Sequence, residues 1–119
     1  MSVQFKSTYP GRAKVDSVLD EAIFQGVKET YDLILGEAVR RAPIDTSALR
    51  QSGQVDVRRS KGDIEARVYF DAPYAEVQHE GDFQHPQGGE RFYLANALKV
   101  HAKHLGPAIA RRIRKLKTQ

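Results

Sequence analysis

Residues 54–70 read QVDVRRSKGDIEARVYF and contain two runs in which apolar and polar side chains alternate. Val55 and Val57 carry the first run, and the apolar positions of the second are Ile64, Ala66, Val68 and Phe70. A period of two is typical of strands with one buried face. Residues 60–63 (SKGD) join the runs, and their glycine supplies the positive φ that a tight hairpin usually needs. The stretch therefore predicts an antiparallel β-hairpin.

A long helix is predicted before the hairpin, over residues 12–41. Its apolar stripe recurs at three- and four-residue spacings through Val15, Leu19, Ala22, Val27, Ile34 and Ala38, and is widened by Ile23, Tyr31, Leu35 and Val39. A stripe this wide implies burial on more than one side, by the chain's own sheet and a second helix or by a neighbouring subunit. Pro43 ends the helix. A brief helical turn through residues 47–49 should follow, capped by Asp45 or Thr46.

A second long helix is predicted after the hairpin, from about residue 91, and Gly106-Pro107 should kink or break it. Between the hairpin and this helix we expect a short helical segment around residues 74–79 and an exposed loop over residues 81–90. The fold class is therefore α+β, with a long N-terminal helix and a C-terminal helix packed on a short antiparallel sheet. We expect residues 1–11 to form an extended arm and residues 12–119 a single domain.

Two strands make a marginal sheet, because an isolated hairpin is barely stable in water. Pairing of strands between subunits would stabilise such a sheet, and an edge left open for a neighbour is one way to build a ring.

The composition suits a single hydrophobic core that is not reinforced by disulfide bonds. The chain has 119 residues, 40% of them hydrophobic, and no cysteine. Its longest apolar runs fall far short of the roughly 20 residues that span a bilayer, and its first residues lack the apolar stretch of a secretory signal. We therefore expect neither a membrane partner nor export.

The positive charge is concentrated at the C-terminal end. Of 19 basic residues, five lie in residues 111–119, where no acidic residue occurs: Arg111, Arg112, Arg114, Lys115 and Lys117. They are candidates for contact with DNA phosphates or with a partner protein. A solvated helix end whose positive charge suits the C-terminal pole of the helix dipole is the alternative.

No arrangement of residues indicates catalysis. His79-Glu80, His85 and the pair His101 and His104 lack the spacing of a zinc-protease motif, and Gly88-Gly89 lacks the lysine of a phosphate-binding loop. Asp71 and Glu76 could form a nuclease-like pair, but acids beside tight turns are usually solvated. We expect a protein that is not an enzyme, with no catalytic residue, no metal and no cofactor.

Two stretches resemble a known family. Residues 42–52 (APIDTSALRQS) are similar to the pattern A-P-(V/I)-D-T-G-x-L-R-x-S of phage minor capsid, neck and tail-completion proteins, which join head to tail. Residues 72–81 (APYAEVQHEG), followed by His85-Pro86, Gly88-Gly89 and residues 92–94 (FYL), resemble a second pattern of the same group. The similarity spans roughly residues 12–105. It departs from the family at Ser47, where glycine is usual, and at Ala95, where an acid is frequent.

The resemblance implies a structural component of the bacteriophage virion, assembled in the cytoplasm of the host bacterium. Its expected role is a homo-oligomeric ring, six- or twelve-fold, that connects the head-completion or adaptor proteins of the portal complex to the tail terminator or tail tube, with only non-specific proximity to genomic DNA. Contact with partners or neighbouring subunits is expected at Arg50, Tyr74, His79, Glu80, His85, Gly88 and Gly89. A small nucleic-acid-binding regulator or an RNase toxin is the alternative function.

Overall fold

The computed structural model describes residues 3–42, 47–72 and 92–117. Its elements follow the order β1 (Val3–Tyr9), α1 (Ser17–Arg41), α2 (Ser47–Gln51), β2 (Gly53–Ser60), β3 (Asp63–Phe70), α4 (Tyr93–His101), the 3₁₀ turn η1 (Ala102–His104) and α5 (Leu105–Lys117). The α+β class, with its long N-terminal helix and its C-terminal helix, is confirmed. The short helical segment expected at residues 74–79 and the loop expected at 81–90 lie outside the described residues.

The sheet has three antiparallel strands in the order β1-β3-β2. The predicted hairpin forms its β2 and β3 strands, from Gly53↔Phe70 to Ser60↔Asp63. Lys61 and Gly62 both have positive φ, of 53° and 84°, which is the signature of a type I′ turn. This turn matches the twist of the flanking strands, so the local sequence fixes the register of the pair.

The N-terminal segment is a correction to the prediction of an extended arm in front of the domain. Val3–Tyr9 is extended, but it belongs to the sheet as strand β1 and pairs with β3 from Val3↔Phe70 to Tyr9↔Ile64. Ser7 and Tyr9 break the apolar character of its inner face, and their hydroxyls are satisfied instead by hydrogen bonds to each other and to Tyr31. A strand whose inner face carries hydroxyl groups has a weak hydrophobic pattern, which is why the sequence did not reveal it.

Helix α1 begins at Ser17, and the predicted start at residue 12 is wrong. Asp16 is its N-cap, and the Asp16 carboxylate accepts a hydrogen bond from the Leu19 amide at 3.0 Å. Val15 therefore lies before the helix and is exposed. The predicted end is confirmed, because Ala42, the residue before Pro43, has the extended ψ of 148° that a following proline favours.

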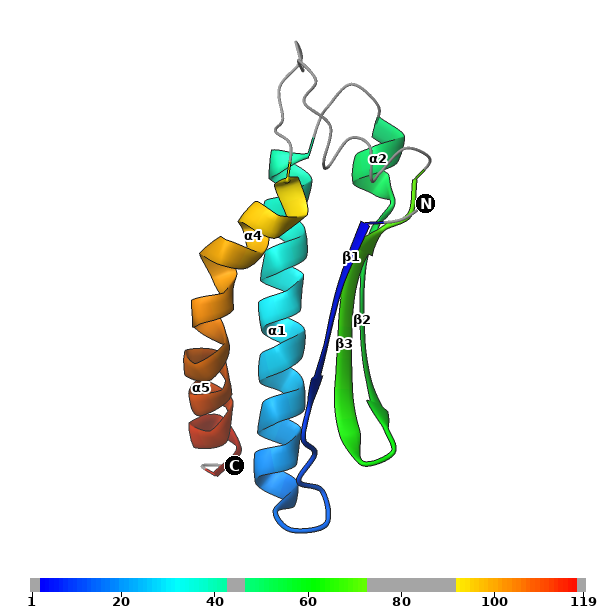
Figure 1. Ribbon diagram of the computed structural model, residues 1–119. Helices are drawn as coiled ribbons and strands as arrows, with labels where there is room; N and C mark the ends of the chain where they lie inside the picture. Colours follow the sequence, from blue (N-terminus) through cyan, green and yellow to red (C-terminus); the bar gives the residue numbers. More distant parts are fainter. Residues whose placement is uncertain (1–2, 43–46, 73–91, 118–119) are drawn as a thin grey trace.

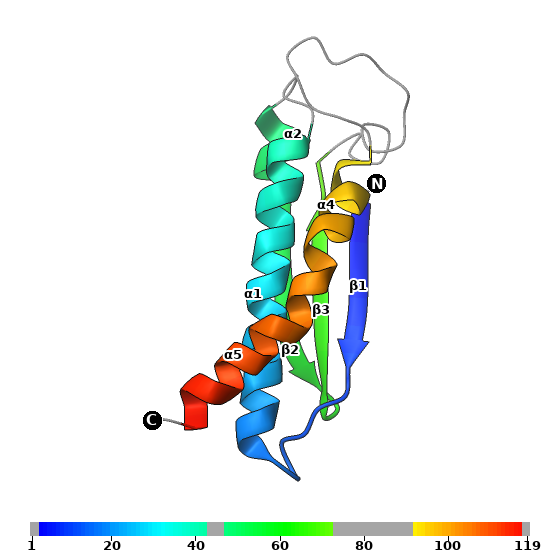
Figure 2. The same ribbon diagram turned by 90° about the vertical axis from the view of Figure 1, so that its left-hand side faces the viewer.

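Helix α1 is buried on two sides, as the width of its apolar stripe predicted. Figures 1 and 2 show that it lies between the sheet and α5, with α4 starting beside the sheet. On the sheet side, Tyr31 and Ile34 are only 2% exposed. The ring of Tyr93 at the start of α4 meets that of Phe70 on β3 edge to face, with centroids 5.0 Å apart. One continuous core therefore joins the described elements.

The predicted break in the C-terminal helix is present, and it lies just before the proline. Pro107 has no amide hydrogen, and its ring would clash with the carbonyl of Lys103 in a continuous α-helix. The chain responds with the 3₁₀ turn η1 at Ala102–His104, so that Pro107 falls in the first turn of α5, where no amide donor is needed. The change of direction brings α5 across α1 (Figure 2).

Gly26 on α1 allows α5 to approach closely. A Cβ atom at Gly26 would lie 2.6 Å from Ile109 Cγ1 and 2.9 Å from the Ile109 amide nitrogen, whereas one at Gly36 would meet only a flexible arginine at 3.8 Å. We expect Gly26→Ala to destabilise the protein by about 1–3 kcal/mol because backbone atoms of α5 must move. Gly36→Ala should stabilise it by about 0.5–1 kcal/mol through helix propensity. Urea unfolding of both variants measures the difference, and equal effects would contradict the close α1–α5 contact.

Candidate interaction surfaces

The described parts of the two stretches singled out in the sequence analysis lie at one end of the fold. The described parts of the first are Ala42 and residues 47–52, and those of the second are Ala72 and residues 92–94. Figure 1 shows the end of α1, helix α2, the end of β3 and the start of α4 at the same end of the molecule. Within these parts, Leu49, Ala72, Tyr93 and Leu94 belong to the core. The described parts of the two stretches therefore lie close together at this end of the molecule.

Arg50, for which the sequence analysis expects a partner contact, makes hydrogen bonds within the chain. Its guanidinium donates hydrogen bonds to the carbonyl oxygens of Ala42, at 2.8 Å from Nη2 and 3.2 Å from Nε, and of Arg40, at 3.0 Å. The last carbonyls of a helix lack partners inside the helix, and a guanidinium fork suits them. Arg50 thus holds α2 against the end of α1 and is a positioning residue for this end of the fold.

The other expected contact residues of this end are not described. Tyr74, His79, Glu80, His85, Gly88 and Gly89 lie outside the described residues, and so does Glu76 of the pair with Asp71. Asp71 itself is exposed. Within the ranges 3–42, 47–72 and 92–117, no group of three or more histidines and acids is placed to hold a metal ion.

The basic end of α5 is partly occupied by contacts within the chain. Arg111 and Arg112 both pair with Glu29 of α1, at 2.8 and 3.0 Å, and Arg112 also donates to Gln25. The two arginines also lower the pKa of Glu29, and the hydrogen bond from Arg111 has the largest effect. Arg114 is exposed. Two of the five residues expected to meet DNA or a partner are therefore engaged in docking α5 on α1.

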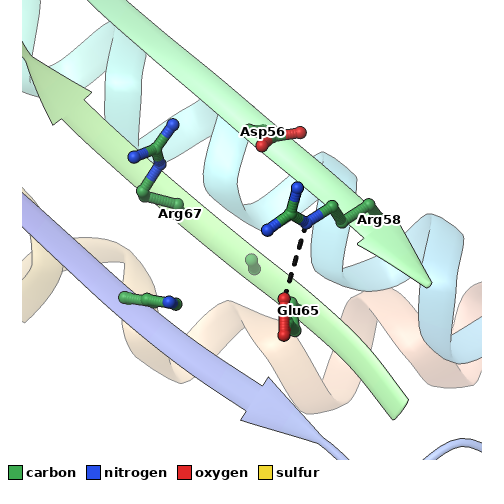
Figure 3. A pocket seen from close by; sticks show the side chains of 6 residues that line it. Asp56, Arg58, Glu65 and Arg67 are labelled. Carbon is green, nitrogen blue, oxygen red and sulfur yellow. Dashed lines mark ion pairs between the residues drawn. The ribbon is translucent and has the colours of Figure 1, made fainter. Parts of the chain in front are cut away.

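The face of the sheet away from the helices is polar and mixed in charge. Figure 3 shows Asp56 and Arg58 of β2 beside Glu65 and Arg67 of β3, and Lys6 of β1 completes the group. Arg58 Nε lies 3.5 Å from Glu65 Oε1. Tyr69 stacks with the Arg67 guanidinium and donates a hydrogen bond to Gln54. Cross-strand pairs of opposite charge make this face favourable in water without a covering layer.

Asp20 and His101 form two polar contacts that the sequence analysis did not identify. The Asp20 carboxylate is buried, accepts a hydrogen bond from the Arg12 amide at 2.7 Å, and pairs with Arg59 Nε at 3.1 Å. His101 Nε2 lies 3.3 Å from Glu37 Oε1. Hydrogen bonds from Arg40, Arg41 and His101 lower the pKa of Glu37 to about 2. Both contacts join residues far apart in sequence, so no local motif could reveal them.

The chain matches no protein-family model, no curated protein and no solved structure in comparisons with known proteins. None of the described helices combines the length and the apolar character needed to cross a bilayer.

Asp20 should make stability dependent on acid pH. Its pKa is lowered below the usual 3.8, first by the hydrogen bond from the Arg12 amide and then by Arg59. A depressed pKa contributes stability that is complete above the unfolded-state value and is lost as the pH falls through the folded-state value. We expect Asp20→Asn to cost about 2 kcal/mol at neutral pH and nearly nothing well below pH 3.8. Denaturant titrations of both proteins across this range check it, and a constant difference would contradict it.

Release of the α5 arginines should expose positive charge. Glu29→Gln removes the shared partner of Arg111 and Arg112, whereas Asp32→Asn changes the net charge equally but breaks only the exposed pair with Lys28. We expect Glu29→Gln to raise the affinity for duplex DNA at low salt more than Asp32→Asn does, equally for unrelated sequences, because phosphate contacts carry no sequence information. Fluorescence anisotropy against salt concentration measures this. Identical curves for the two variants would show that these arginines do not reach DNA.

Proposed function

We propose that this chain is a non-enzymatic component of a bacteriophage neck, a ring-forming head–tail connector or tail-completion protein. The observation that carries the proposal is that the described parts of both stretches lie at one end of a sheet whose outer strands, among the described residues, each pair only with β3. The shared end would meet the adjoining ring, and the edges would join neighbouring subunits.

The edges support the ring because they are long. Among the described residues, β1 and β2 each pair only with β3, over seven and eight positions. An edge of this length presents a row of unpaired amides and carbonyls, which proteins usually shorten, cover or pair. Pairing with a neighbour satisfies these groups, and a head-to-tail arrangement of two different edges closes into a ring when the rotation allows it.

The charges support a role beside DNA that does not read sequence. Arg111 and Arg112 both pair with Glu29, and the outer sheet face mixes Lys6, Arg58 and Arg67 with Asp56 and Glu65. A mixed surface holds a polyanion weakly, which suits a path along which a genome must move. An RNA-cleaving toxin or a nucleic-acid-binding regulator would instead be expected to keep these cations available for phosphates.

The free edge of β2 allows a direct test. In a two-residue hairpin the closing pair, Ser60↔Asp63, is hydrogen-bonded, and hydrogen-bonded pairs alternate along the ladder. Val57 then directs its amide away from β3, toward the free edge. Val57→Pro removes that donor with little effect on the β2–β3 ladder, because proline is tolerated where the amide faces outward. Val57→Ala loses the same side chain and keeps the amide, so it is the matched control.

We expect the purified wild-type chain and Val57→Ala to form closed rings, seen by negative stain and sedimentation velocity. Val57→Pro should sediment as a monomer, and its circular dichroism spectrum should show that it is folded. Rings from all three proteins would contradict assembly through the β2 edge. A wild-type protein that stays monomeric at high concentration, or that degrades RNA, would overturn the proposed function itself.

A further inference from the structure

Two opposite charges on the outer face of the sheet have no ionic partner within the described part of the chain. Lys6 lies on β1 and Asp56 on β2, which are the two outer strands, and both line the same small hollow. Each is paired in register with Arg67 of β3, whose guanidinium stacks on a tyrosine ring. Neither Lys6 nor Asp56 makes a hydrogen bond or an ion pair with a described residue. One outer strand thus carries a cation without an anion, and the other carries an anion without a cation.

A ring of subunits determines the direction in which these two strands would meet. β1 and β2 are both antiparallel to β3, so they run parallel to each other. A head-to-tail ring relates all its subunits by one rotation axis. When β1 of a neighbour continues the sheet beside β2 in such a ring, it keeps its direction and its outer face. The two strands that meet are therefore parallel, with their outer faces on the same side.

The backbone limits the registers in which they can pair. Val57 directs its amide and carbonyl to the outer edge of β2, and by the same alternation Lys6 and Thr8 direct theirs to the outer edge of β1. In a parallel ladder, a residue that faces the partner strand bonds to the two residues on either side of the one opposite. With Val57 opposite Ser7 of the neighbour, its amide donates to the Lys6 carbonyl. Its carbonyl then accepts from the Thr8 amide, and Asp56 lies beside the Lys6 side chain.

Charge selects this arrangement from the registers that the backbone allows. We call it the level register, because the residues that meet are those that flank the same residue of β3 within one chain. The allowed alternatives differ from it by two residues. A shift in one direction places Lys6 beside Arg58, which is a like charge, and a shift in the other direction places it beside Gln54. Opposite charges stabilise neighbouring strands and like charges destabilise them, so only the level register gives Asp56 a cation.

We propose that adjacent subunits join β1 to β2 as parallel strands in the level register, with Lys6 of one subunit paired with Asp56 of the next. On the inner face, the same register brings the half-buried Val55 beside Phe5, whose ring is 39% exposed. An aromatic and a β-branched side chain form a favourable pair on a sheet. Pairing β2 with β2 of a second subunit would instead make a closed dimer and leave Lys6 without an acid. This inference rests on the proposed ring and names the contact that joins its subunits.

Disulfide cross-linking tests the register, because the chain has no cysteine of its own. Gln4 and Gln54 are exposed, and the level register places Gln4 of one subunit beside Gln54 of the next. Within one chain β3 separates them, so their Cα atoms are about 9–10 Å apart, too far for a disulfide. We expect oxidised Gln4→Cys/Gln54→Cys to give a ladder of covalent oligomers on a denaturing gel. Thr8→Cys/Gln54→Cys is the matched control, four residues out of register, and should remain a single chain on the same gel.

Charge reversal tests the ion pair. Lys6→Glu leaves an acid on both outer strands and Asp56→Lys leaves a base on both, so each variant alone should need about fivefold more protein to assemble at low salt. A mixture of the two variants should assemble like the wild type, because an acid then meets a base at every contact. Lys14 is exposed in the loop before α1 and has no ion pair with a described residue. Lys14→Glu makes the same change of charge away from both strands and should assemble normally.

The outcomes separate this contact from the ring itself. Wild-type rings without cross-linking of Gln4→Cys/Gln54→Cys, or with no effect of either charge reversal, would refute the level register and leave the proposed ring intact. Equal cross-linking of the Thr8→Cys/Gln54→Cys control would refute it as well. A wild-type chain that forms only dimers would favour pairing of β2 with β2. That result, or a wild-type monomer, would refute the proposed ring together with this contact.

Discussion

The structure depends on the burial of helix α1 on two opposite sides. One side carries Tyr31 and Ile34 into the core beneath the sheet, and the other is narrow enough at Gly26 for Ile109 of α5 to touch the helix backbone. In this chain, strands before and after α1 form the sheet that covers one side, and a second helical segment covers the other. The order of β1, α1, the hairpin and the C-terminal helices provides both layers in a single chain.

The elements with local signals could be predicted from the sequence. Glycine in a two-residue turn determines the β2–β3 hairpin, Pro43 ends α1, and Pro107 breaks the last helix within a few residues of its own position. Each of these effects acts on the nearest turn of the chain. The start of α1 was predicted too early because Val15 continued the apolar spacing, whereas the capping carboxylate of Asp16 decided where the helix begins.

The contacts that the sequence did not predict are those made across long separations. Strand β1 pairs with β3 through backbone groups that carry no residue identity, and its inner face presents Ser7 and Tyr9 to a hydroxyl partner on α1. Arg59 forms a hydrogen bond with Asp20, 39 residues away in sequence, and Arg111 forms one with Glu29, 82 residues away. Charged residues of this kind look the same in sequence whether they are solvated or paired, so only the fold assigns them. The same limit applied to Arg50, whose partners are helix carbonyls and leave no sequence pattern.

Different interactions attach the helices to the two ends of the sheet. At the hairpin end, the buried carboxylate of Asp20 joins the loop before α1 to the partly exposed Arg59 of β2 through charge-assisted hydrogen bonds. At the opposite end, α2 is tied to α1 by the Arg50 guanidinium, and the ends of β3 and α4 lie beside it. Arginine bonds to backbone carbonyls position an element without covering it with apolar surface. The described part of that end is thus ordered where it adjoins the core, by the Arg50 hydrogen bonds and by the packing of Leu49 and Tyr93.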